Sequence, residues 1–183
     1  VYGDSESPLR YAGAATWRSV VELEGDIMAP GTAKYYNGRG RQFVLFPCGG
    51  KRFYWGVISV EPEGGKDPPG ASREMLCELL ADFPAVAREV VAATREGEIS
   101  RTDLYDRDPA SVWVKGRVLL LGDAAHLTTP FIGQGAGISM EDSVVLAKEL
   151  ALTDGLRDQR MLGVALDAYQ QARVPRCTKV VLT

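Results

Sequence analysis

The sequence lacks the features that mark several common functional classes. It contains three cysteines and one histidine, and Cys48, Cys77 and Cys177 stand too far apart for a zinc motif or a disulfide framework. No apolar run approaches the roughly 20 residues that cross a membrane, and no basic block indicates binding to nucleic acid. We therefore expect free thiols, no metal site, no membrane span and no nucleic-acid partner, in a cytoplasmic protein.

The composition that is present is that of an ordinary globular protein. Hydrophobic residues make up 45% of the 183 positions and charged residues 25%, and the net charge is −3, all within the usual range. The length fits one large domain or two small ones. The chain begins with Val1 and has no charged, apolar leader, so we expect a trimmed chain or a fragment without a secretory signal.

The first part of the chain has the pattern of a β-sheet with two helices. The hydrophobic periodicity predicts strands over 14–23, 41–47, 52–60 and 98–105. The segment Cys48-Gly-Gly-Lys51 predicts a hairpin, and Gln42, Val44 and Phe46 should share one face of its first strand. Helical spacing predicts a helix over 72–83 and a second one after Pro84. The Pro/Gly-rich segment 61–70 predicts a mobile loop.

The last part of the chain has the pattern of an α/β unit. The run 117–121 is short and nearly all apolar, which is typical of a strand buried on both faces of a layered sheet. Apolar spacing predicts helices over 135–152 and 161–182, and Pro175 should kink the second or mark its boundary. The fold class is therefore mixed, α+β with α/β: a mixed sheet with two helices, then a buried strand and two long helices.

The stretch between that strand and the helix at 135 carries the clearest chemical signal. Asp123 follows the strand directly, and a carboxylate there needs hydrogen-bond donors, such as the hydroxyls of a polyol. Gly133, Gly135 and Gly137 leave the backbone open where a helix directs its free N–H groups outward. The stretch matches neither G-x-G-x-x-G nor a P-loop. Spacing alone leaves two interpretations open, a cofactor- or anion-binding loop and a plain glycine-rich helix entry.

These residues carry a family resemblance. Gly122-Asp-Ala-Ala-His126, Pro130, Gly133-Gln-Gly135 and Glu141-Asp142 resemble the second flavin-binding motif of the single-component FAD-dependent monooxygenases, the aromatic hydroxylases with the para-hydroxybenzoate hydroxylase fold. Weaker similarity points to the zeaxanthin-epoxidase-like and urate-hydroxylase-like branches, the latter through Thr128-Thr-Pro130.

The resemblance implies roles for particular residues. Asp123 would hydrogen-bond the ribityl chain of FAD, and Pro130 would pack near the flavin ring on the substrate side, as a catalytic residue. Tyr54 is a candidate for both catalysis and substrate contact, and Gln42 and Phe131 are candidates for substrate contact alone. Gln42 stands where some relatives carry an arginine, so we expect no cation for an anionic substrate. The residues beside the pyrimidine edge of the isoalloxazine would be Gly133, Gln134, Gly135, Ala136 and Gly137.

The resemblance also implies a reaction. NADH or NADPH would reduce the flavin, O2 would add to form a flavin C4a-hydroperoxide, and one oxygen atom would pass to an electron-rich aromatic or polyene substrate. The product would be a hydroxylated or epoxidised small molecule.

The family's amino-terminal G-x-G-x-x-G and its central Asp-Gly motif do not occur in this sequence. The resemblance therefore covers a carboxyl-terminal part only: a substrate-domain sheet with two helices over 1–112, and the last part of the FAD-binding domain over 113–183. We expect the isolated chain to bind FAD poorly, to be inactive, and to self-associate or pair with a complementing amino-terminal segment.

Two alternatives stay open: a non-catalytic remnant or interaction module, and a related flavoprotein such as a halogenase or a reductase. For the polar residues near the motif we expect structural roles. His126 should pack or hydrogen-bond, Glu141 and Asp142 should bond nearby backbone or arginine groups, and Arg173 and Arg176 should form exposed surface ion pairs of little energetic value.

Overall fold

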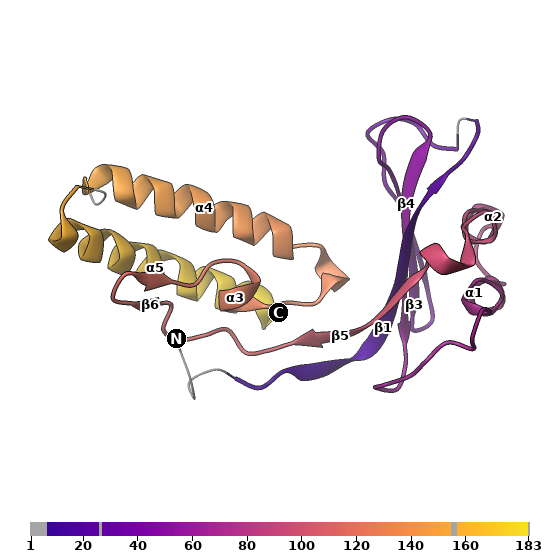
Figure 1. The fold of residues 1–183 in the computed structure, drawn as a ribbon, viewed down its shortest axis with the longest axis horizontal. Coiled ribbons are helices and arrows are strands. Elements are labelled where there is room, and N and C mark those ends of the chain that lie inside the picture. The colour runs from indigo at the N-terminus through magenta and orange to yellow at the C-terminus, as the bar shows by residue number, and fades with distance from the viewer. Residues whose placement is uncertain (1–6, 26, 155–156, 183) are drawn as a thin grey trace. The chain divides into compact units, whose positions relative to one another are not determined.

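The structure is a computed structural model that describes residues 7–25, 27–154 and 157–182 (Figure 1). The chain forms two compact units, which are described separately. The first comprises Gly13–Leu104, and the second comprises the residues from Tyr105 onward together with the first described residues of the chain.

The first unit is built on a five-stranded sheet in the order β2-β3-β4-β1-β5. β1 pairs with β4, β4 with β3 and β3 with β2, each time antiparallel. The four predicted strands and the hairpin at Cys48 are confirmed, and the sequence analysis missed β2. The strands are β1 (Arg10–Glu22), β2 (Lys34–Gly38), β3 (Arg41–Pro47), β4 (Arg52–Val60) and β5 (Ser100–Asp106).

The helices α1 (Ser72–Leu79) and α2 (Ala85–Ala92) cover one face of this sheet (Figure 1). Strand alternation directs Phe43 and Leu45 into the core beneath them, whereas Gln42 and Val44 lie on the opposite face. Trp55 at the centre is fully buried and donates its indole N–H to Thr94 Oγ1 at 2.9 Å. The predicted helix 72–83 ends at Leu79; the guanidinium of Arg41 donates to the Leu79 carbonyl there, which satisfies one of the free carbonyls at that end.

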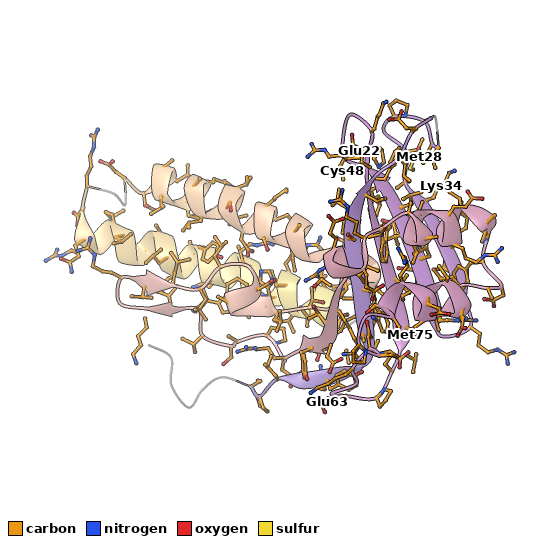
Figure 2. All side chains as sticks on the ribbon, turned by 45° about the vertical axis from the view of Figure 1, so that its right-hand side comes forward. Glu22, Met28, Lys34, Cys48, Glu63 and Met75 are labelled. Carbon is orange, nitrogen blue, oxygen red and sulfur yellow. The ribbon has the colours of Figure 1, made fainter. Side chains whose placement is uncertain are left out.

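Polar contacts fasten the loop 61–70, which the sequence predicted to be mobile. Asp67 accepts the indole N–H of Trp17 at 2.8 Å, and the Gly64 N–H donates to Asp103 at 2.7 Å. The guanidinium of Arg101 lies 5.4 Å from the Trp17 ring centroid, a cation–π distance. Figure 2 shows Glu63 of this loop at the end of the sheet opposite to Glu22.

The second unit consists of a short β-hairpin followed by helices. The predicted strand 117–121 is wrong in length: only Val118–Leu119 is a strand, and Val118 is 46% exposed in this chain. Its one partner among the described residues is another two-residue strand, so no layered sheet covers its faces. The elements are β6 (Val114–Lys115), β7 (Val118–Leu119), α3 (Asp123–His126), the 3-10 turn η3 (Pro130–Ile132), α4 (Gly135–Leu152) and α5 (Gln159–Val181).

The helices α4 and α5 pack side by side (Figure 1), and both predicted long helices are confirmed. Asp158 caps α5 by accepting the N–H of Arg160 at 2.7 Å. Pro175 lies inside α5, which continues to Val181, so Pro175 does not mark a helix boundary. Pro175 and Gln171 are both exposed, so the Gln171 carbonyl that loses its N–H partner lies on the solvent side. None of the helices, as far as the chain is described, combines the length and apolarity needed to span a membrane.

Candidate functional site

Asp123 is the first residue of α3 and follows Gly122, whose φ of 61° and ψ of −141° suit glycine alone. The carboxylate is exposed, and no described group hydrogen-bonds it. The expectation that this carboxylate sits directly on a buried strand is wrong, because β7 ends at Leu119 and residues 120–122 separate it from Asp123. The result is an acceptor that is open to a ligand.

The glycine-rich turn leads from η3 into α4. Pro130 opens η3, and Gly133 closes it with a left-handed φ of 63°. No side chain caps the start of α4, so its first N–H groups remain available as donors. A methyl group on Gly133 would meet nothing within 4 Å, and one on Gly137 would meet only the Gln134 amide oxygen at 4.0 Å. The backbone of this turn is therefore accessible to a flat molecule.

A cavity of about 560 Å³ lies next to the same turn. Another cavity, in the first unit, has a volume of about 350 Å³. Phe131 lines the cavity next to the turn and is 45% exposed. Pro130 is also exposed but does not line this cavity. The other lining residues are Arg10, Tyr11, Ala12, Asp106, Thr128, Thr129, Ile132, Val180 and Val181.

A buried polar network lies behind the turn. Asp142 of α4 is fully buried; its Oδ2 accepts from His126 Nε2 at 2.7 Å and from the Gly122 N–H at 3.1 Å. Its Oδ1 accepts from Arg173 Nε at 2.7 Å. Arg173 also donates to Glu141 at 2.9 Å. The structural roles expected for His126, Glu141 and Asp142 fit this geometry, whereas the expectation of an exposed Arg173 is wrong: it is 4% exposed.

The network holds its carboxylates ionised. Burial raises the pKa of Asp142, but hydrogen bonds from His126, Arg173 and Gly122 outweigh burial and leave that pKa below its ordinary value. Hydrogen bonds from Arg176 and then Arg173 lower the pKa of Glu141 to about 2.

The sheet of the first unit presents a second group of candidate residues on its face opposite α1 and α2. Gln42 donates to Asn37 Oδ1 at 2.8 Å. Tyr54 stacks on Phe46 with ring centroids 5.8 Å apart. A methyl group on Gly56 would lie 3.2 Å from the Tyr54 hydroxyl, so the Tyr54 side chain fills the place that a side chain on Gly56 would take. Gln42 and Tyr54 thus share one face of β3 and β4, as the alternation predicted.

The sequence analysis missed Arg18 on this face. Strand pairing places Arg18 opposite Gly56, and Arg18 is exposed without an ion-pair partner in the described part of the chain. Burial raises the pKa of Tyr54, and the positive charge of Arg18 opposes that rise. The expectation of a face without a cation therefore does not hold. The signal was present, because Arg18 follows Trp17, whose large apolar side chain marks the core side of β1.

An exposed carboxylate before an uncapped glycine-rich helix start is typical of proteins that bind a nucleotide cofactor. Comparison with known proteins shows to which family of cofactor-binding proteins the chain belongs. Residues 22–183 match the family described as "FAD binding domain", and the chain belongs to this family.

The relatives are flavin-dependent monooxygenases. The chain is 38% identical over 172 residues to the aurachin C monooxygenase/isomerase of Stigmatella aurantiaca. The aligned region covers 94% of this chain and 43% of that protein. It is 37% identical to the FAD-dependent urate hydroxylase of Mycolicibacterium vanbaalenii, over 94% of this chain and 42% of that protein. The family resemblance and FAD as the family's cofactor are thereby confirmed.

A solved structure shows the same fold. Klebsiella pneumoniae HpxO complexed with FAD and uric acid superimposes with a TM-score of 0.82 at 34% identity, over 96% of this chain and 44% of that one. This chain thus spans less than half the length of the proteins that it resembles.

Proposed function

We propose that the chain is part of an FAD-dependent monooxygenase that uses NADH or NADPH and O2 to hydroxylate or epoxidise an electron-rich aromatic or polyene small molecule. The observation that carries the proposal is the turn from Gly122 to Gly137, where an exposed carboxylate that bonds no described residue precedes a helix start without a side-chain cap. Family membership supports the same cofactor.

The residues of the turn fit FAD by the chemistry of their donors and acceptors. The Asp123 carboxylate would accept hydrogen bonds from the ribityl hydroxyls. The amides of 134–137 and the positive end of α4 would donate to the carbonyl edge of the flavin and stabilise negative charge there; the Gly133 N–H is taken by the Pro130 carbonyl at 3.1 Å. Pro130 and Phe131 supply apolar surface beside the ring. When bound, FAD supplies the electron transfer from NADH or NADPH and the activation of O2.

The family resemblance also assigns the two parts of the chain to different domains. In our proposal, residues 1–112 form the substrate-domain sheet with its two helices, and residues 113–183 form the last part of the FAD-binding domain. The relatives support this assignment: HpxO was solved in complex with FAD and uric acid.

The substrate in this proposal lies on the open face of the sheet. Gln42 offers an amide to a polar group of the substrate, and the unpaired charge of Arg18 favours a substrate with a carbonyl or an acidic group. Arg18 and Gln42 would fix the orientation of the ring, and Tyr54 would contact it.

A titration of the labelled chain with FAD tests the cofactor site. We expect weak binding, with amide NMR shifts confined to Asp123 and 133–137 and reduced by Asp123→Asn. Asp167→Asn is the matched control, because Asp167 is an exposed carboxylate on α5. Shifts that are scattered over the surface, or their absence at millimolar FAD, would contradict the proposal.

The exposed side of α4 supports the proposal of self-association or pairing with a complementing segment. Met140 and Val144 are each 69% exposed and Leu152 is 70% exposed, so this helix presents apolar side chains away from α5. We expect the mass measured by light scattering to rise with concentration, and Val144→Lys to suppress that rise. A monomer at every concentration would contradict this expectation.

A further inference from the structure

The buried cluster behind the glycine-rich turn connects three helices through one carboxylate. Asp142 on α4 bonds His126 on α3 and Arg173 on α5. All three side chains are buried, at 0%, 0% and 4% exposure. Arg173 also donates to the Ile138 carbonyl at 3.1 Å. The carboxylate is therefore saturated with donors, and its position is set from both neighbouring helices.

The chemistry of this cluster disfavours a bound metal ion. His126, Asp142 and Cys177 offer ligand atoms within 4.8 Å of one another. The guanidinium of Arg173, however, lies 2.7 Å from Asp142 and 3.5 Å from the Cys177 sulfur. Burial raises the pKa of that thiol to about 11, so it stays protonated. A fixed cation and a protonated thiol both disfavour a second cation in the same place.

The carboxylate acts on the backbone immediately before Asp123. Asp142 accepts the Gly122 N–H, and the Gly122 carbonyl accepts from the N–H groups of Ala125 and His126 at 2.8 and 3.0 Å. Both polar groups of Gly122 are thus occupied while it holds a conformation with positive φ. A methyl group at Gly122 would lie 3.1 Å from Ser139 Oγ of α4. The direction in which the chain enters Asp123 is therefore determined by α4.

His126 keeps this arrangement at a cost. Because Asp142 is ionised, His126 Nε2 is the donor in the hydrogen bond between them. Nδ1 is buried without a partner among the described residues. A buried polar atom without a partner is costly and is seldom retained without a compensating role. The histidine is thus committed to Asp142 through one nitrogen only.

We propose that Asp142 is a positioning residue for the cofactor carboxylate: through Gly122 and His126 it fixes the backbone that presents Asp123, and Arg173 holds Asp142 in place from α5. The inference rests on the proposed function, since it concerns the orientation of Asp123 toward FAD. Asp142 itself is buried and does not contact the cofactor.

The test compares Asp142→Asn, His126→Leu and His126→Gln with the control Ser143→Ala, an exposed position next to Asp142. Hydrogen exchange is measured by NMR on the chain without FAD. We expect Asp142→Asn and His126→Leu to speed exchange at 122–126 far more than in α5. His126→Gln should restore protection, because its amide nitrogen replaces Nε2 as a donor.

The second measurement is FAD affinity at a temperature where every variant is folded. Asp142→Asn should weaken FAD binding by about tenfold or more, the loss expected when a charge-assisted hydrogen bond no longer orients the site. A merely structural role would raise exchange evenly over the unit and leave affinity unchanged, which would overturn the inference. Failure of the wild-type chain to bind FAD would overturn the proposed function, and the exchange pattern would still decide whether Asp142 fixes Gly122.

Discussion

Arg173 and Arg176 offer a matched test of how burial determines the value of an ion pair. Both project from α5 and both bond Glu141. They differ in environment, because the side chain of Arg173 is 5% exposed and that of Arg176 is 46% exposed. Arg173 alone also neutralises the fully buried Asp142.

The structure predicts losses of stability of very different size. Arg173→Met leaves the buried carboxylate of Asp142 without its counter-charge, which costs about 3–5 kcal/mol. Arg176→Met removes a solvent-screened pair, so its loss should be much smaller. A second change, Asp142→Asn on the Arg173→Met background, should recover part of the loss because it removes the unpaired charge.

The assay is unfolding in urea, monitored through hydrogen exchange of peptides from α4 and α5. These peptides report on the unfolding of this unit separately from the sheet. With a urea dependence of about 2 kcal/mol per molar, the midpoint should fall by about 2 M for Arg173→Met and by much less for Arg176→Met. Equal shifts for the two variants would refute the reasoning, because they would mean that burial of the pair has no energetic consequence.

Three further outcomes follow from the structure. Stabilisation by ionised Glu141 is fully present above the ordinary pKa of a glutamate and is lost as pH falls toward 2. Glu141→Gln should therefore reduce the pH dependence of the free energy of unfolding between about pH 4.5 and 2. An unchanged pH dependence would argue against this role of Glu141. Exposed Cys48 should react with a thiol reagent at neutral pH, while buried Cys177, with its pKa near 11, should react only after unfolding; rapid labelling of both would count against the buried network. Thr94→Val should cost about 1–3 kcal/mol in urea unfolding because Trp55 loses its acceptor, whereas Thr94→Ser should not.

The sheet was predictable because its signals are local. Alternation in 41–47 separates Phe43 and Leu45 from Gln42 and Val44, and burial follows that pattern. The short strand β2 was missed because its face pattern becomes informative only once it pairs with β3. The predicted strand 117–121 was wrong for a related reason: an apolar run reports what could be buried, and its burial depends on sheet neighbours far away in the sequence.

The candidate turn was found from its residue types, but the residues behind it were not. Arg173 resembled any charged residue on a long helix, since nothing near it in the sequence shows that it meets Asp142, 31 positions earlier. Pairs of this kind arise from helix packing rather than from a local pattern. Arg18 was missed for a different reason, because its role depends on strand pairing with Gly56.

The two aspartates of the motif differ in role: Asp142 supports the fold, whereas Asp123 is open to a ligand. Asp142 is fully buried, and its oxygens accept from three donors, on α3, at the N-cap of α3 and on α5, so it has no capacity left for a ligand. Asp123 is exposed and bonds no described group. Because an exposed carboxylate contributes little to folding, its placement beside an uncapped helix start is more readily explained by what it binds than by what it stabilises.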